Sequence, residues 1–358
     1  MKALRICLIA SSRFPIREPF AGGLEAHTHS LAAALIERGH AVTLYAAPGS
    51  DPALAVDTLP VAPFAASAQA RRDVCAPPET WMAEHHAYLS LMLALQRSGR
   101  RRFDVVHNNS LHHLPVAMAP ALELPMLTTL HTPPTPWLES AMRIGGRSTA
   151  VVAVSHATAR QWAGVADVGV IANGIDVARW ALGSGGEHAV WLGRVVPEKG
   201  AHLAIDAARR AGMKLVLAGP LHDPEYFGQQ VAPRLGEDVR YAGHLGGAAL
   251  RRLVAESRVA LVTPRWDEPY GLVAAEAMAC GTPVAAFARG GLPELVTEDS
   301  GRLAPPDDVD ALARALIEAA ALPREGVRRH AERALSIDVM VDAYEEAYFA
   351  MVQGRVAA

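Results

Sequence analysis

The chain has 358 residues, of which 51% are hydrophobic and 20% charged, a composition that excludes a disordered protein. A net charge of −3 disfavours a general nucleic-acid-binding protein. Three widely separated cysteines and no long uncharged apolar run predict a cytoplasmic protein without a disulfide framework or a transmembrane helix. The length predicts two domains.

The first half of the chain alternates apolar runs with helical patterns. Apolar positions repeat at helical spacing from Leu24 to Arg38, and Glu79–Gln96 also has the pattern of a helix. Predicted strands lie at Leu4–Ala10, Ala41–Ala46, Val105–Val106, Met126–Leu130 and Ala150–Ser155. Strand, loop, helix and strand in this order form βαβ units, which predict a parallel sheet.

The alternation starts again after a glycine-rich stretch at 172–187, which has the composition of a linker. Further strands are predicted at Ala189–Leu192, Lys214–Ala218, Val239–Ala242, Ala260–Thr263 and Pro283–Phe287, with helices at Ala201–Ala211, Ala274–Ala279 and Asp310–Ala321. We therefore predict an α/β protein with two Rossmann-like, doubly wound domains at 1–172 and 173–337. A last helix, about 338–358, is expected to pack back on the first domain through its aromatic residues.

Two glycine-containing loops have the chemistry of a phosphate site. Gly22 and Gly23 open the first helix, where free N–H groups and the helix dipole favour an anion, although a flexible turn is the simpler alternative. The segment from Gly193 to Gly200 follows a strand and carries Arg194 and Lys199, the two cations that a diphosphate requires when no metal neutralises it. A solvated charged loop is the alternative here.

A third loop, Glu268–Glu276, turns into an apolar helix. Its helix-start amides are expected to be free donors, and its two glutamates are eight residues apart, so they can reach different hydroxyls of one ligand. His131 ends a predicted strand, where the first domain would present it to a cleft; a structural histidine is the alternative. Doubly wound sheets bind ligands beyond the carboxyl ends of their strands, so these loops are expected to meet in an interdomain cleft.

Three features indicate other chemistry but have simpler explanations. Asp308-Val309-Asp310 spells a metal motif, yet its place before an alanine-rich helix favours capping. The histidines are scattered or adjacent, so no metal site is predicted. A basic cluster at Arg97 and 100–102 is expected to be a solvated helix end, and peripheral membrane contact is the less favoured alternative.

In this order the motifs resemble those of the retaining glycosyltransferases of family 4 (glycosyl transferases group 1), which have the GT-B fold. The resemblance covers nearly the whole chain. Its most specific part is EPYGLVAAEAMACGTPV from Glu268, and it extends through GGLE at 22–25, NGID at 173–176, GRVVPEKG at 193–200 and GGLPE at 290–294.

The resemblance implies roles for individual residues. Arg194 and Lys199 would neutralise the diphosphate, and Glu276 would accept hydrogen bonds from the ribose hydroxyls. Glu268 would bind hydroxyls of the donor sugar, and His131 would also contact that sugar. Further donor contacts are implied for Gly22, Gly23, Gly219, His244, Leu245, Tyr270, Gly271, Leu272 and Val273, with the base near Gly219, His244 and Leu245.

The implied activity is transfer of a hexosyl unit from a UDP- or GDP-sugar, with retention of configuration and without a metal or other cofactor. Nothing in the sequence identifies the base, the sugar or the acceptor, which is expected on the first domain and could be a glycan, a lipid or a small metabolite. A nucleotide-sugar epimerase of the same architecture and a non-catalytic nucleotide-sugar-binding subunit remain alternatives.

Overall fold

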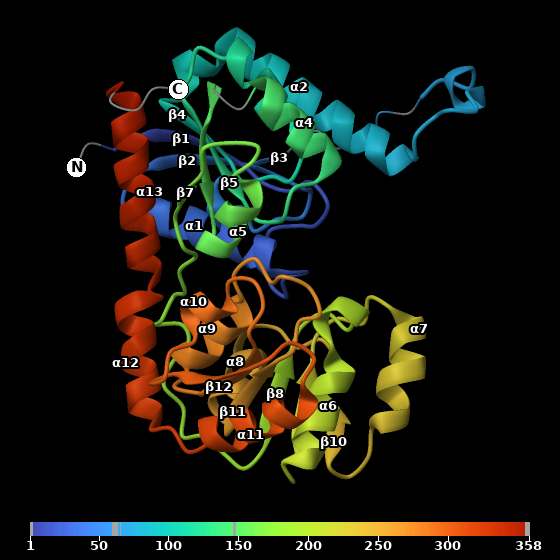
Figure 1. The fold of residues 1–358 in the computed structure, drawn as a ribbon. Helices are drawn as coiled ribbons and strands as arrows, with labels where there is room; N and C mark the ends of the chain where they lie inside the picture. Colours follow the sequence, from blue (N-terminus) through green and yellow to red (C-terminus); the bar gives the residue numbers. More distant parts are fainter. Residues whose placement is uncertain (1–2, 59–63, 65, 146–147, 355–358) are drawn as a thin grey trace.

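The computed structural model describes residues 3–58, 64, 66–145 and 148–354, and it contains two parallel sheets, one in each half of the chain (Figure 1). The first sheet has seven strands in the order β3-β2-β1-β4-β5-β6-β7. The second has six, in the order β10-β9-β8-β11-β12-β13. In each sheet the order reverses beside the first strand, as in doubly wound folds. The predicted fold class, two Rossmann-like domains, is confirmed.

The strands of the first sheet are short and mostly buried on both faces, which explains why they appear in the sequence as continuous apolar runs. They are β1 Arg5–Ile9, β2 Ala41–Ala46, β3 Val56–Thr58, β4 Val105–Asn108, β5 Met126–Leu130, β6 Ala150–Ala153 and β7 Gly169–Val170. The helices of this half are α1 Gly23–Glu37, α2 Glu79–Arg102, α3 His113–Met118, α4 Pro136–Gly145 and α5 His156–Trp162.

The second half repeats this arrangement. Its strands are β8 Ala189–Leu192, β9 Leu215–Ala218, β10 Val239–Tyr241, β11 Val259–Val262, β12 Val284–Phe287 and β13 Gly301–Ala304. Its helices are α6 Ala201–Arg210, α7 Pro224–Tyr226, α8 Gly247–Ala255, α9 Leu272–Ala279, α10 Leu292–Leu295, α11 Val309–Ala319 and α12 Arg324–Ala334. The last helix, α13, spans Ile337–Val352, and residues 355–358 of the predicted terminal helix lie outside the described part.

Every predicted strand is present, but β3, β7 and β13 were missed. Strands β3 and β7 have three residues or fewer, too few to show a periodic pattern. Strand β13 has buried ends and two more exposed residues between them, so it forms neither a continuous apolar run nor a regular alternation. Each missed strand lies at or near the edge of its sheet. The predicted sheets are therefore narrower than the observed ones, but the predicted position of the cleft is unaffected.

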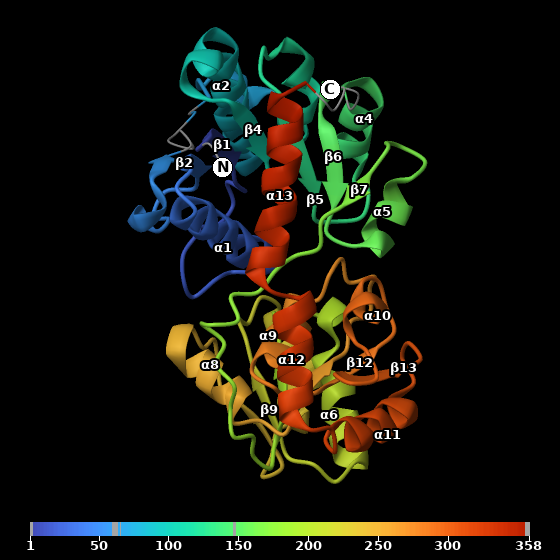
Figure 2. The same ribbon diagram turned by 90° about the vertical axis from the view of Figure 1, so that its left-hand side faces the viewer.

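The chain crosses between the two halves twice, and the crossings lie side by side. The Ile175 amide donates to the Leu335 carbonyl (2.7 Å), and the Ile337 amide donates back to the Ile175 carbonyl (2.8 Å). Beyond this bridge α13 runs along the first domain, continuing the column that α12 begins on the second (Figure 2). Its Tyr344 and Tyr348 are fully buried in the core of the first domain.

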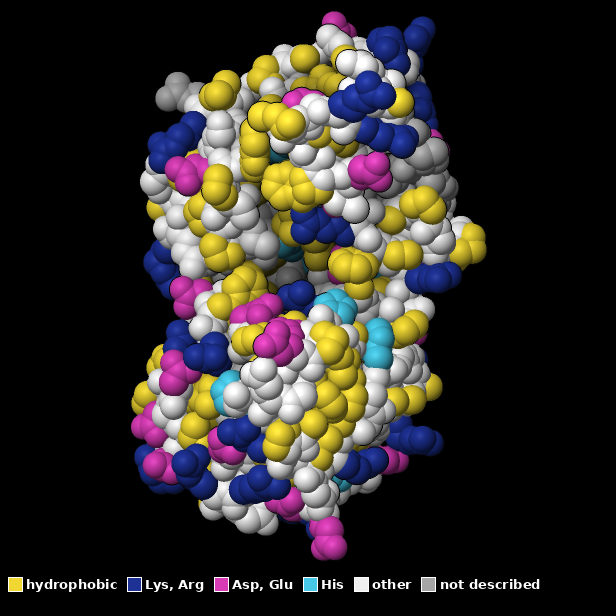
Figure 3. Space-filling view, turned by 90° about the vertical axis from the view of Figure 1, so that its right-hand side faces the viewer, with side chains coloured by type: hydrophobic (Ala, Val, Ile, Leu, Met, Phe, Trp, Pro, Cys, Tyr) yellow, Lys and Arg dark blue, Asp and Glu magenta, His cyan; other side chains and the backbone are white. Residues whose placement is uncertain are grey.

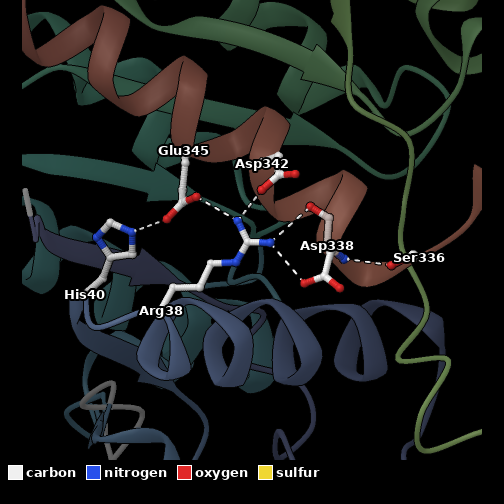
Figure 4. A network of polar contacts seen from close by, with 6 residues as sticks. All are labelled: Arg38, His40, Ser336, Asp338, Asp342 and Glu345. Carbon is white, nitrogen blue, oxygen red and sulfur yellow. Dashed lines mark hydrogen bonds and ion pairs between the residues drawn. The ribbon is translucent and has the colours of Figure 1, made fainter. Parts of the chain in front are cut away.

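An ionic network, buried at Glu345 and exposed at Asp338 and Asp342, fixes α13 to the end of α1 (Figure 4). Glu345, only 5% exposed, accepts from Arg38 Nη1 (2.7 Å) and contacts His40 Nε2 (2.7 Å). Arg38 also pairs with Asp342 and with Asp338 on the same helix. Burial opposes ionisation of Glu345, but hydrogen bonds from His40 and Arg38 outweigh it and hold the pKa of this carboxyl below its usual value.

Removing that carboxylate should loosen the terminal helix. We expect Glu345→Ala to lower the free energy of unfolding of the first domain by about 2 kcal/mol, because Arg38 and His40 lose a buried partner. Urea denaturation followed by circular dichroism measures this change. Glu346→Ala is the matched control, since Glu346 is an exposed neighbour on the same helix. Equal stability of the two variants would contradict the structural role of the network.

Candidate active site

A cleft of about 450 Å³ separates the two domains, and it is visible as the hollow between the two halves in Figure 3. Loops after β1, β4 and β5 form one wall, and loops after β8, β9 and β11 form the other. All residues predicted for the site line this cleft, namely Gly22, Gly23, His131, Arg194, Lys199, Gly219, His244, Leu245, Glu268, Tyr270, Gly271, Leu272, Val273 and Glu276. The structure thus brings together residues that are up to 254 positions apart, from Gly22 to Glu276.

The basic loop and the glutamate loop are joined by an ion pair. Lys199 Nζ lies 2.5 Å from Glu268 Oε2, and the side chains are only 21% and 15% exposed. The Trp266 indole donates to the same oxygen (3.2 Å), and the ammonium lies 5.2 Å from the centroid of that ring. Half-buried Arg194 forms no ion pair within the described residues, so its guanidinium is available to an anion in the cleft.

The start of α9 is shaped by Gly271. Its φ of 105° lies in the left-handed region, and a Cβ there would stand 2.6 Å from Leu292 Cδ2, so only glycine fits. Tyr270 anchors the same turn, because its hydroxyl donates to the Asn173 carbonyl in the NGID segment (2.5 Å). The Ala274 amide donates to the Gly271 carbonyl (2.9 Å), whereas the Leu272 and Val273 amides have no partner within the described residues, and both residues line the cleft at the positive end of the helix.

The first domain meets this turn at its own glycine loop. A Cβ on Gly23 would lie 3.1 Å from Leu272 Cδ1, so the beginning of α1 and the beginning of α9 approach closely. Two helix N-termini thereby face one space, an arrangement suited to a doubly charged group such as a diphosphate. Glu25, in the first turn of α1, is also buried here, and burial raises the pKa of its carboxyl.

Glu276 lies one turn into α9 and is mostly buried. Burial, with a smaller contribution from the charge of Glu18, raises the pKa of the Glu276 carboxyl to about 8. Glu18 itself comes from the first domain and pairs with Arg251 of α8 (3.2 Å) and with Arg179 (3.0 Å). A carboxyl that is protonated near neutral pH in a cleft is typical of a functional group.

His131 is held in one orientation by a chain of hydrogen bonds. Its Nε2 bonds to Asn109 Oδ1, Asn109 Nδ2 donates to Thr28 Oγ1 (2.7 Å), and Thr28 Oγ1 donates to the Leu24 carbonyl (2.8 Å). Burial, followed by the nearby imidazoles of His27 and His107, lowers the pKa of His131 well below its usual value. The imidazole is therefore neutral at physiological pH.

The terminal helix supports His131 from below. His107 bonds to the Tyr348 hydroxyl (2.7 Å) and to Thr129 Oγ1 (2.8 Å), and Thr129 Oγ1 bonds to the Tyr344 hydroxyl (3.1 Å). His27 packs edge-on against His131 with ring centroids 4.9 Å apart. The ring of His27 also lies 6.4 Å from that of Tyr344, so α13 supports this cleft residue from the core, although no described residue of α13 lines the cleft.

Several lining residues were missed by the sequence reasoning. They are Arg13, Glu18, His27, Arg179, His222, Arg251 and Trp266. Most of them lie in loops or on helix faces without a motif, and only their tertiary position brings them to the cleft. His222 illustrates this, because its ring stacks across the cleft on Phe14 of the first domain at 6.4 Å.

The region predicted to bind the base has a tight backbone contact. Gly219, with φ of 150°, would place a Cβ 1.8 Å from the Gly193 carbonyl oxygen, so the loops after β8 and β9 touch directly. His244 and Leu245 line the same end of the cleft. Only glycine permits this approach, which brings the base region next to the basic loop.

The aspartates of the metal-like motif lie elsewhere. Asp308 caps α11 by accepting from the Ala311 amide (2.8 Å), and Asp310 pairs with Arg210 (2.9 Å). Neither residue lines the cleft. The predicted capping role of Asp308 is confirmed. No cluster of histidine, cysteine or acidic residues with metal-binding geometry is found in the described ranges.

Two family models divide the chain between them. The model described as "Glycosyltransferase Family 4" matches residues 21–179, and the model described as "Glycosyl transferases group 1" matches residues 176–334. Among the described helices, none combines the length and apolar character needed to cross a membrane.

Characterised relatives and solved structures agree with these matches. Glycogen synthase of Mycobacterium tuberculosis is 31% identical over 347 residues, covering 82% of this chain and 81% of its own length. D-inositol 3-phosphate glycosyltransferase of Actinosynnema mirum is 26% identical over 352 residues, covering 82% and 83%.

Among solved structures, AviGT4, a glycosyltransferase involved in avilamycin A biosynthesis, is 25% identical with a TM-score of 0.71 and covers 98% of each chain. Anabaena HepE in complex with UDP and glucose shares the fold, with 19% identity, a TM-score of 0.75, and coverage of 97% of this chain and 100% of its own. The resemblance noted in the motifs is thereby confirmed, and the chain belongs to the group 1 glycosyltransferases of family 4, enzymes with the GT-B fold.

Proposed function

We propose that this enzyme transfers a hexosyl unit from a UDP- or GDP-sugar to an acceptor held by the first domain, with retention of configuration and without a metal ion. One observation carries the proposal. The Lys199–Glu268 pair, the free Arg194 and the start of α9 meet His131 across a single cleft. HepE, of the same fold, has been solved with UDP-glucose as well as with UDP and glucose, which supports a nucleotide-sugar donor.

The diphosphate would lie between the two helix N-termini, facing Arg194 and Lys199. These cations and the amides at the start of α9 would stabilise the charge that develops on the leaving group, which is the main electrostatic task of the reaction. Lys199 already has a partner in Glu268, so it can share its charge with a phosphate while its ammonium stays oriented.

Retention is proposed to follow a front-face path. The bond from the anomeric carbon to the phosphate oxygen breaks, the acceptor oxygen bonds to the same face, and its proton passes to the departing phosphate oxygen. Retaining hydrolases instead place a carboxylate nucleophile across the sugar. Here Glu268 and Glu18 are engaged in ion pairs, and burial raises the pKa of the Glu25 and Glu276 carboxyls, which favours the front-face path.

Neither alternative has comparable support. The comparisons give no support to the epimerase, and both family models describe glycosyltransferases. A non-catalytic subunit is disfavoured because both family models and the glycogen synthase relative describe enzymes.

Nucleotide binding provides the first test. We expect UDP or GDP to raise the melting temperature in the presence of EDTA, because protein cations replace the metal. Arg194→Ala and Lys199→Ala should each weaken this binding about tenfold or more. Lys214→Ala is the control, since Lys214 is exposed outside the cleft. Failure of both nucleotides to bind in EDTA would refute the proposal.

The protonation of Glu276 provides a second test. Its pKa of about 8 keeps Glu276 protonated at neutral pH. If the ribose hydroxyls donate to the ionised carboxylate, Glu276 must lose its proton when the nucleotide binds. Nucleotide affinity should therefore rise as pH increases from about 7 to about 8.5, by several-fold. Calorimetric titration should show weaker, pH-independent binding for Glu276→Gln. The control Glu237→Gln, at an exposed glutamate, should show the same pH dependence of affinity as the wild type. If the affinity of Glu276→Gln still rises with pH, the proton belongs to another group.

Stereochemistry provides a third test. Slow hydrolysis of the donor should release a sugar of the donor's own anomeric configuration, detected by proton NMR before mutarotation, and EDTA should leave the rate unchanged. An inverted product, or a covalent glycosyl-enzyme detected by mass spectrometry, would overturn the front-face path.

A further inference from the structure

Four aromatic rings form a continuous stack in the first domain. Tyr88 stacks on His112 (4.4 Å between centroids, 22°), and His112 stacks on His113 (4.4 Å, 24°). His113 in turn stacks on Trp137 (5.2 Å, 28°). The rings come from three separate segments, namely α2, the β4–α3 loop with the start of α3, and the start of α4.

The buried end of this ring stack adjoins the floor of the cleft. The Tyr88 hydroxyl donates to the Ala10 carbonyl (2.9 Å) and accepts from the Ser12 amide (3.0 Å), immediately after β1. Ser11 and Leu111, the neighbours of these contacts in sequence, both line the cleft. The opposite end, Trp137, follows the cleft residues His131 and Thr132 by only a few positions.

Trp137 is presented to solvent as a flat, supported surface. Its side chain is 62% exposed although its ring packs on His113, so the exposed part includes the face that His113 does not cover. Aromatic side chains of this size are normally buried, and one that is supported by a stacked ring, five residues after the cleft residue Thr132, loses little entropy when a ligand stacks on it.

The charge around the ring stack favours a neutral ligand over an anionic one. Burial, then the neighbouring imidazoles and Arg13, lowers the pKa of His112 to about 3, and burial with His85 lowers the pKa of His113, so both rings are neutral at physiological pH. Arg13, the cation that acts on His112, is paired with Glu84 (3.0 Å). The imidazoles stack face to face, so their nitrogens do not converge, and they form no metal cluster within the described residues.

We propose that the exposed face of Trp137 is a stacking platform for a pyranose ring of the acceptor, and hence that the acceptor is a neutral saccharide. The proposal rests on the proposed glycosyl transfer, and it adds the acceptor class. Pyranoses have a face of weakly polarised C–H groups that packs on the electron-rich face of an indole. Their hydroxyls also need polar partners near the ring stack, and His85 lies 6.4 Å from His113 between ring centroids.

The experiment follows the indole N–H resonances of the enzyme by NMR, with the Trp137 signal identified from its loss in Trp137→Phe. Maltohexaose, mannotriose, chitotetraose and galactobiose are each titrated to about 10 mM, with and without UDP. We expect at least one saccharide to shift the Trp137 signal, and Trp137→Ala to weaken that saccharide about tenfold. His113→Ala, which removes the support beneath the indole, should weaken it less.

Trp81→Phe is the matched control, because Trp81 is comparably exposed at 53% and lies outside the ring stack. It should leave saccharide affinity unchanged, and all these variants should keep the melting-temperature shift produced by UDP. If UDP binds but no saccharide shifts the Trp137 signal, the acceptor assignment is wrong and the proposed transfer still holds. The same conclusion follows if anionic phospholipid vesicles or inositol phosphate shift the signal and saccharides do not. Failure of both UDP and GDP to bind the wild type would instead refute the proposed transfer.

Discussion

The ion pair between Lys199 and Glu268 is the interaction on which the geometry of the cleft depends. It joins the loop after β8 to the loop after β11, two neighbouring strands at the point where the strand order reverses. Such a switch point leaves a crevice at the carboxyl edge of the sheet. A pair that is largely withdrawn from solvent can hold the two loops at a fixed separation, and it keeps a cation oriented toward that crevice.

The domains are held together by contacts that continue from these same loops. The Pro269 carbonyl, next to Glu268, accepts from Ser155 Oγ (2.6 Å) and from Thr158 Oγ1 (3.2 Å) of the first domain. Glu294, in the GGLPE motif, accepts from the amides of His156 and Ala157 at the start of α5 (2.8 and 2.6 Å). A carboxylate at a helix N-terminus is a favourable electrostatic contact, so this motif residue helps to orient one domain on the other.

The terminal helix has two functions in one element. Its Arg38–Glu345 network fixes it to α1, while the Tyr344 and Tyr348 hydroxyls bond to Thr129 Oγ1 and His107 Nδ1 of the first-domain sheet. A segment at the far end of the sequence thus supports the site from the first-domain side, where α1 also supplies the glycine loop. The linker bridge at Ile175 and Ile337 keeps this helix in register with the second domain.

The sequence by itself determined the fold class and the identity of the cleft loops. Apolar runs located ten of the strands, and the motifs at their carboxyl ends had to meet because parallel strands end at a common edge. Local chemistry was also readable, as in the capping of α11 by Asp308. Only the tertiary structure decided that Lys199 pairs with Glu268, that His27 packs on His131, and that Trp137 completes a ring stack begun by Tyr88. Those contacts depend on how helices and loops that are distant in sequence are placed on the sheets. The periodicity of apolar residues indicates which face of a helix or strand is buried, but it does not indicate which other element packs against that face.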